Sequence, residues 1–101
     1  MEKIKIDGSI KLTLTEGLTA NNVPKFNEGL KELIPPDEAF KSLILDLGQI
    51  DNIDSVGVTF VISLFKQMKN NEKAFKVSGA SEDIISLFKL MKLDQFFEMI
   101  D

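Results

Sequence analysis

Residues 43–65 read LILDLGQIDNIDSVGVTFVISLF, and the fold class follows from the change of pattern inside this stretch. Residues 42–47 form a short, mostly apolar run of strand length, and residues 48–53 form a polar connection with turn-forming Gly, Asp and Asn. Downstream, apolar residues recur at spacings of three and four, which predicts one face of a helix over residues 55–70. That face consists of Val58, Val61, Ile62, Phe65 and Met68.

The flanking sequence predicts further strands and helices of ordinary length. Gly8 separates two runs of alternating character, which favours a hairpin, and Pro35 with Pro36 ends a helical pattern that precedes them. The expected elements are strands at 3–7, 9–15, 42–47 and 74–78, helices at 20–34 and 55–70, and a helix starting at Ser81. The tail at 94–101 is compatible with a short strand or a helical turn. The order predicts a single α/β domain with a mixed sheet of about four to five strands packed against helices.

The composition excludes several classes of function. The chain has 101 residues, 44% of them hydrophobic and 28% charged, and we expect one domain over residues 1–101. A net charge of −4 argues against nucleic-acid binding, which needs clustered Lys and Arg. With no His and no Cys we expect neither a metal site nor a cofactor. The N-terminus lacks the apolar core of a signal peptide and no apolar run suggests a membrane span, so we expect a cytoplasmic protein without direct membrane insertion.

Ser55 occupies the predicted first turn of the central helix, and its position supports two interpretations. The unpaired N–H groups and the positive end of the helix dipole would stabilise a phosphate carried on its hydroxyl. The simpler alternative is that Ser55 is only the helix N-cap, a role that serine commonly takes. Asp54 is correspondingly a residue that shapes the loop before the helix, a solvated loop residue or an alternative cap. Gly57 indicates close approach by a backbone or a partner, or plain packing.

The hydrophobic pattern of the sequence suggests roles for two further residues. Asp46 interrupts an apolar strand, so we expect it at a strand end or accepting backbone hydrogen bonds, in a structural role. Phe60 falls off the main apolar face of the helix, which makes it a candidate docking residue beside Val56. Core packing on a helix buried along two sides is the alternative for Phe60.

Residues 43–65 resemble the signature region of the STAS family, the sulfate transporter and anti-sigma factor antagonist domain. The element order and length are also similar to a stand-alone bacterial anti-sigma factor antagonist, so the resemblance covers essentially the whole chain. In that family an Asp-Ser-Ser-Gly segment follows the central strand, and a partner anti-sigma factor phosphorylates the serine directly after the aspartate. By this resemblance Asp54 matches the aspartate, Ser55 the phosphoacceptor and Gly57 the glycine.

The chain departs from the family pattern at two positions. Val56 replaces the second serine and puts an apolar group on the expected docking surface. Thr19 falls near the end of the second strand, where members often carry an aspartate, and this removes a charge close to the expected phosphosite. The partner-binding set implied by the resemblance and the pattern is Thr19, Asp54, Ser55, Val56, Gly57 and Phe60.

The resemblance implies a partner-switching phosphoprotein in transcription regulation. Unphosphorylated, such a protein binds an anti-sigma serine kinase and frees a sigma factor; phosphorylated on Ser55 it dissociates, and a serine phosphatase resets it. The alternative is a constitutive STAS interaction subunit of a transporter or signalling assembly, with Ser55 as a helix cap. We do not expect an enzyme, because Asp46, Asp51, Asp54 and Ser55 come without a Gly-rich phosphate loop or a base for the serine.

Overall fold

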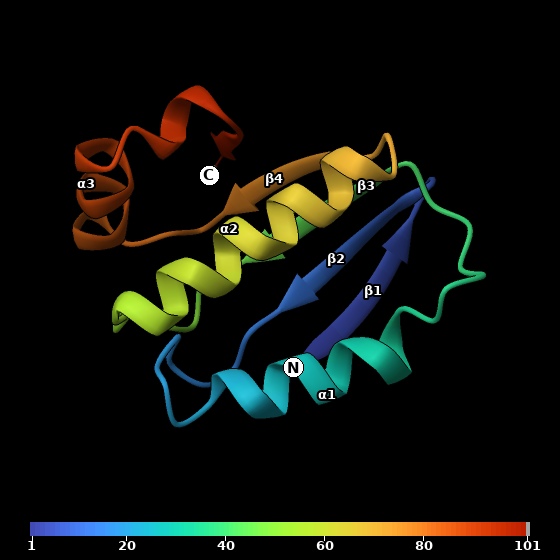
Figure 1. Cartoon of the computed structure of the whole chain (residues 1–101), viewed down its shortest axis with the longest axis horizontal. Coiled ribbons are helices and arrows are strands. Elements are labelled where there is room, and N and C mark those ends of the chain that lie inside the picture. Colours follow the sequence, from blue (N-terminus) through green and yellow to red (C-terminus); the bar gives the residue numbers. More distant parts are fainter. Residues whose placement is uncertain (101) are drawn as a thin grey trace.

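The computed structural model describes residues 1–100, which form a five-stranded sheet with three α-helices and one 3₁₀ turn (Figure 1). In chain order the elements are β1 (Glu2–Ile6), β2 (Ser9–Thr13), α1 (Val23–Leu33), β3 (Ser42–Asp46), α2 (Ser55–Asn70), β4 (Ala74–Ser78), α3 (Glu82–Leu90), η1 (Leu93–Gln95) and β5 (Glu98–Ile100). The predicted α/β domain with a mixed sheet is confirmed.

The strands lie in sequence order across the sheet, β1-β2-β3-β4-β5. β1 is antiparallel to β2, and all other neighbouring pairs are parallel. Because β2, β3 and β4 run in the same direction, the loops that lead from them into α1, α2 and α3 all leave from the same edge of the sheet. This edge is therefore where segments distant in sequence meet.

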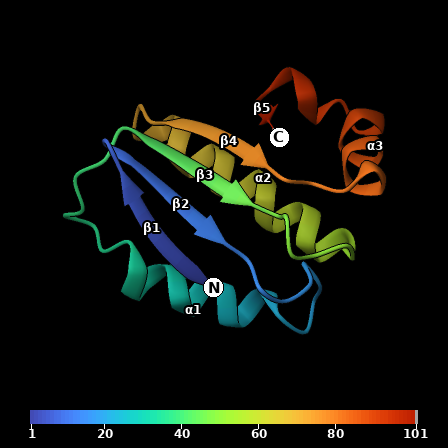
Figure 2. The same cartoon turned by 180° about the vertical axis from the view of Figure 1, so that it is seen from behind.

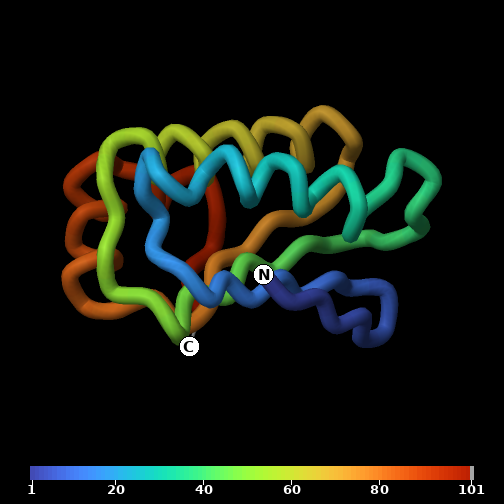
Figure 3. The backbone as a smooth tube through the Cα atoms, turned by 90° about the horizontal axis from the view of Figure 1, so that it is seen from below, coloured from blue at the N-terminus to red at the C-terminus, as the bar shows by residue number. Residues whose placement is uncertain are grey.

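Helices α1 and α2 cover one face of the sheet, whereas the other face is open (Figures 2 and 3). Alternate strand residues point to the helices and are fully or almost fully buried, as expected for period-2 strands with one covered face. These residues are Ile10, Leu12, Leu43, Leu45, Phe75 and Val77. On the open face the side chains are polar or partly exposed, and Ile4 and Ile6 of β1 are 51% and 54% exposed.

The expected element boundaries need small corrections at loop ends. The first helix starts at Val23 instead of residue 20, because the Thr19 carbonyl accepts hydrogen bonds from the backbones of Asn22 and Val23 and so turns the chain there. The helix ends at Leu33, ahead of Pro35. The predicted strands 3–7, 9–15 and 42–47 shift or shorten by one or two residues, and helix 55–70 and strand 74–78 are as expected. The tail contains both a 3₁₀ turn and a strand; Asp101 lies outside the described residues.

Asp46 has the structural role expected from its place in an apolar strand. Its carboxylate accepts hydrogen bonds from the Thr13 hydroxyl at 3.1 Å and the Gly48 backbone N–H at 2.9 Å. Lys11 on the open face adds an ion pair at 3.7 Å. These bonds hold the end of β3, where the connection to α2 begins.

Truncating a side chain should lower the free energy of unfolding by very different amounts on the two faces of the sheet. Leu45→Ala removes a fully buried side chain from the central strand and should lower the free energy of unfolding by about 2–5 kcal/mol. Ile4→Ala, on the open face of the edge strand, should change it by no more than about 1 kcal/mol. Urea unfolding followed by circular dichroism measures both, and equal losses would contradict the one-sided core.

Candidate functional site

The N-terminus of α2 and the segment after β2 form one surface at the carboxyl edge of the sheet. The Leu18 N–H donates to the Asn52 carbonyl at 3.1 Å, and the Asp54 N–H donates to the Leu18 carbonyl at 3.0 Å. These bonds make a single parallel bridge between Leu18 and Ile53. Figure 3 shows the two connecting segments side by side at one end of the helical layer. Residues near positions 19 and 55 therefore belong to the same site.

The Asp54 side chain links the two segments that form this site. Its backbone is extended, with φ −120° and ψ −176°, and one carboxylate oxygen accepts from the Gly57 N–H at 2.9 Å, as an N-cap does. The other oxygen accepts from the Ala20 N–H at 2.8 Å. The hydrogen bonds from Ala20 and Gly57 hold the pKa of the Asp54 carboxyl below its ordinary value, since they stabilise the charged form. Asp54 thus caps α2 and binds the neighbouring loop with a single side chain.

Ser55 is the first residue of α2 and its side chain is exposed. Among residues 1–100 no hydrogen bond involves its hydroxyl oxygen; only its backbone carbonyl is used, by the Thr59 hydroxyl at 3.0 Å. The interpretation of Ser55 as the N-cap is therefore wrong, because Asp54 fills that position and makes the capping bond. The hydroxyl points to no structural partner and is accessible.

Gly57 lies beneath the loop that follows β2 and has a structural role. It is buried, and a Cβ built on it would lie 1.9 Å from the Leu18 carbonyl oxygen. The sequence-based expectation of a close backbone approach is correct, and the approaching backbone belongs to this chain. Gly57 is therefore removed from the predicted set of partner-contacting residues, because it is buried beneath the Leu18 backbone.

The remaining predicted site residues divide between surface and core. Val56 is 42% exposed beside Ser55 and presents an apolar contact. Thr19 is half-buried and sits between Leu18 and Ala20, both bonded to Asp54. Phe60 is only 5% exposed, and its ring centroid lies 5.8 Å from that of Phe26. Its inclusion among the docking residues is therefore wrong, and the alternative of core packing on a helix buried along two sides is confirmed, because the second side of α2 packs against α1.

Sequence reasoning missed the loop partners of the site. Leu18 and Ala20 contribute backbone groups only, so their side-chain types carry no signal of the contact. Gly57 was the one hint, since glycine inside a helix favours close approach. Gly17 shows a similar constraint, because a Cβ there would overlap the Asn52 side chain.

Other kinds of site find no support in the part of the chain that the structure describes. Residues 1–100 bring together no group of three or more His, Cys, Asp or Glu side chains suited to a metal ion. Within the same residues, no helix combines the length and apolarity that a membrane crossing requires. The exposed Ser55 hydroxyl has no imidazole beside it, since the chain contains no His.

Comparison with known proteins agrees with this arrangement. The family model for the STAS domain matches residues 1–101, and the chain belongs to the STAS domain family. A candidate anti-sigma factor antagonist from Thermotoga maritima has a similar structure, with a TM-score of 0.89, 17% identity, and coverage of 99% of this chain and 85% of that chain. These values describe a shared fold.

Two further solved structures share the fold at low identity. A chain from the stressosome, described as a signal integration and transduction hub, matches with a TM-score of 0.75, 18% identity and coverage of 98% of this chain and 86% of that chain. A sulfate transporter family protein from Wolinella succinogenes matches with a TM-score of 0.81, 15% identity and coverage of 98% and 81%. The same fold is thus present in all three of these solved structures.

Gly57→Ala should destabilise the protein although alanine normally favours a helix. The added methyl group meets the Leu18 carbonyl, which is backbone and cannot rotate away, so we expect a loss of about 1–3 kcal/mol in unfolding free energy. Gly29→Ala in α1 is the matched control. Its methyl group meets only the flexible end of Met1, so helix propensity should dominate and stabilise by about 0.5–1 kcal/mol. Opposite signs in urea unfolding confirm the contact, and a stabilised Gly57→Ala variant contradicts it.

Asp54 should make stability depend on pH in the acid range. Its folded pKa is lowered, so its contribution is present above the ordinary value of 3.8 and is lost as pH falls through the folded pKa. Unfolding free energies of the native chain and Asp54→Asn, measured from pH 7 to pH 2, should differ most at the neutral end and converge at the acid end. A difference that stays constant over the whole range argues against the carboxylate as the fastening group.

Proposed function

We propose that this chain is an anti-sigma factor antagonist that binds an anti-sigma serine kinase, thereby frees a sigma factor, and is switched off by phosphorylation of Ser55. The observation that carries the proposal is the state of the Ser55 hydroxyl. It is exposed at the first position of α2 and forms no hydrogen bond within residues 1–100, because Asp54 caps the helix. A kinase can therefore modify it without removing a bond that the fold needs.

The chain is a substrate in this scheme. The kinase supplies the nucleotide, the metal ion and the base, and this chain supplies an accessible hydroxyl on a rigid helix end. The exposed Val56 and the half-buried Thr19 flank the acceptor and offer contacts for the kinase. Asp54 holds these two segments in register through Gly57 and Ala20. The unphosphorylated surface is thus preorganised for binding.

Phosphorylation would oppose binding through local electrostatics. A phosphoserine brings about −1.5 to −2 charges at neutral pH. It would stand beside Asp54 and near the exposed Asp51, on a chain with a net charge of −4. At an interface these charges repel acidic partner groups and resist desolvation around Val56. The first-turn N–H groups and the dipole of α2 accommodate the phosphate, so the domain stays folded while the complex dissociates.

Two of the solved structures that share the fold support this scheme through their described roles. One is described as a candidate anti-sigma factor antagonist and another comes from a signalling hub, both across most of their length. The proposed cellular setting is the cytoplasm, where a serine phosphatase would remove the phosphate from Ser55 and restore binding. In this setting the protein regulates transcription through partner exchange alone.

Incubation with a candidate anti-sigma serine kinase from the same organism and Mg-ATP should add one phosphoryl group to the native chain. Ser55→Ala should stay unmodified and keep its affinity for the kinase. Ser63→Ala is the matched control, because it removes an exposed serine from the same helix and should be phosphorylated like the native chain. Intact-mass spectrometry measures the modification, and size-exclusion chromatography measures the complex before and after it.

Two results would contradict the proposal. One is an unmodified native chain in the presence of a kinase that phosphorylates another substrate. The other is a phosphorylated chain that binds the kinase as tightly as before. Either result would favour a constitutive STAS interaction subunit in which Ser55 is an ordinary surface residue.

A further inference from the structure

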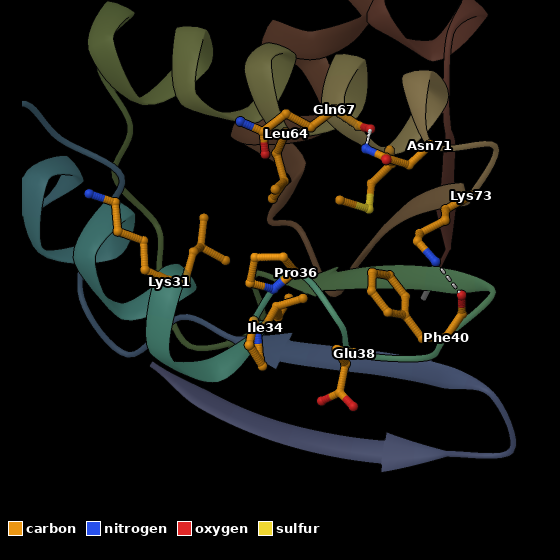
Figure 4. A pocket seen from close by; sticks show the side chains of 12 residues that line it. Lys31, Ile34, Pro36, Glu38, Phe40, Leu64, Gln67, Asn71 and Lys73 are labelled. Carbon is orange, nitrogen blue, oxygen red and sulfur yellow. Dashed lines mark hydrogen bonds between the residues drawn. The ribbon is translucent and has the colours of Figure 1, made fainter.

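A cavity of about 670 Å³ opens at the opposite end of α2 from Ser55. It lies between the C-terminal ends of α1 and α2 and the segment that connects α1 to β3 (Figure 4). Its volume falls in the range of about 300–1,000 Å³ that small-molecule sites occupy. The cavity is separate from the Ser55 surface, since it shares no lining residue with it.

The cavity has an apolar interior. Five of its lining side chains are hydrophobic and come from all three walls: Leu30, Ile34, Phe40, Leu64 and Met68. Leu64 and Met68 are 3% and 7% exposed and belong to the core, while the other three pack against that core and remain partly accessible. In Figure 4 the Leu64 side chain points from α2 toward Pro36. An alkyl chain placed here would replace water on a continuous apolar surface.

The Pro35–Pro36 pair explains why the cavity stays open. The prolines cannot continue α1, whose last hydrogen bond runs from the Ile34 N–H to the Leu30 carbonyl at 2.9 Å. α1 ends at Leu33 whereas α2 continues to Asn70, so the chain that follows α1 borders the C-terminal part of α2 as an irregular segment. The prolines therefore build the rim of the cavity.

The charges at the rim are mostly positive. The Lys73 ammonium donates to the Phe40 carbonyl at 2.6 Å and lies 4.0 Å from the Phe40 ring centroid. It is absent from the ion pairs formed among residues 1–100. Lys31 pairs only with Glu28 at 3.6 Å, and both side chains are about three-quarters exposed, so this pair is weak. In Figure 4 the Lys31 nitrogen points away from Phe40, so Lys73 is the ammonium group that the rim offers to a ligand.

Glu38 is the acidic residue of the lining, and its charge is already balanced. Its carboxylate forms ion pairs with Lys3 and, at 3.2 Å, with Lys5. These two lysines hold the pKa of the Glu38 carboxyl below its ordinary value, mainly through their hydrogen bonds, so it stays ionised and paired. The Glu38 charge therefore does not neutralise Lys73, although the chain as a whole carries a net charge of −4.

From this combination we infer that the cavity binds a free alkyl carboxylate, with its chain over Leu64 and Met68 and its carboxylate at Lys73. A cationic amphiphile fits the same apolar floor but meets the Lys73 ammonium at the rim. A neutral hydrocarbon leaves Lys73 without a new partner. The Gln67 side-chain amide also lines the cavity and is an additional donor for a carboxylate, whereas the Asn71 amide already donates to the Gln67 backbone carbonyl at 2.7 Å.

The test uses the whole chain and dodecanoate below its critical micelle concentration, with dodecyltrimethylammonium as the cationic comparator of equal chain length. Dodecanoate should bind at one site by calorimetry and shift the backbone NMR signals of residues around Leu30, Ile34, Leu64 and Met68, leaving those around Ser55 in place. The comparator should bind at least about tenfold more weakly, because a charged hydrogen bond is replaced by repulsion.

Lysine variants test where the carboxylate of dodecanoate binds. Lys73→Gln should weaken dodecanoate binding about tenfold, and Lys31→Gln should weaken it less while leaving the bond between Lys73 and Phe40 intact. Lys66→Gln, an exposed lysine of α2 outside the cavity lining, is the matched control and should bind like the native chain. Thermal unfolding of each variant verifies that it folds.

Several outcomes would overturn the inference. They are equal binding of dodecanoate and its cationic comparator, unchanged affinity in both Lys73→Gln and Lys31→Gln, and NMR shifts that map outside the cavity. Binding to anionic lipid vesicles without binding of monomeric dodecanoate would also overturn it, since the ligand would then be a membrane surface.

Discussion

The contact between the Leu18 backbone and the first turn of α2 is the constraint on which the shape of the candidate site depends. The Leu18 carbonyl accepts the Asp54 N–H and occupies the space above Gly57 where any other residue would carry a Cβ. Asp54 then closes the arrangement with bonds to Ala20 and Gly57. As a result, two loops more than thirty residues apart behave as one surface, and the capping of α2 is inseparable from the position of the loop after β2.

Helix α2 links three different environments along its length. Its first turn is exposed at Ser55 and Val56, its middle is buried against the sheet and α1 through Val61 and Phe60, and its last turns line the cavity at Met68. A helix packed in this way moves as a unit, because its middle cannot shift without disturbing close-packed neighbours. The proposed switch and the inferred ligand site therefore sit on the two ends of one rigid element.

The sequence was sufficient for the elements and their order but insufficient for the contacts between loops. Strand and helix periodicity placed residues 55–70 and 74–78 correctly, since burial on one face leaves a periodic trace. The role of Asp54 as the cap was weighed only as an alternative, because serine and aspartate are comparable caps and adjacent in the chain. Phe60 was included among the candidate docking residues, but the alternative of core packing is correct, because α1 buries a second side of α2 and periodicity does not reveal where α1 lies. The bond from Ala20 involves a backbone group, so no side-chain pattern could reveal it.

The arrangement of the site separates the groups that hold the loops together from those that face solvent. Asp54, Gly57 and the Leu18 backbone maintain the shape, whereas the Val56 side chain makes no comparable internal contact and is 42% exposed. Duplicated copies of such a domain can therefore diverge at the exposed positions with little effect on folding. Evolution of this surface is thus largely uncoupled from evolution of the core, and related copies in one genome can acquire separate, mutually insulated partners.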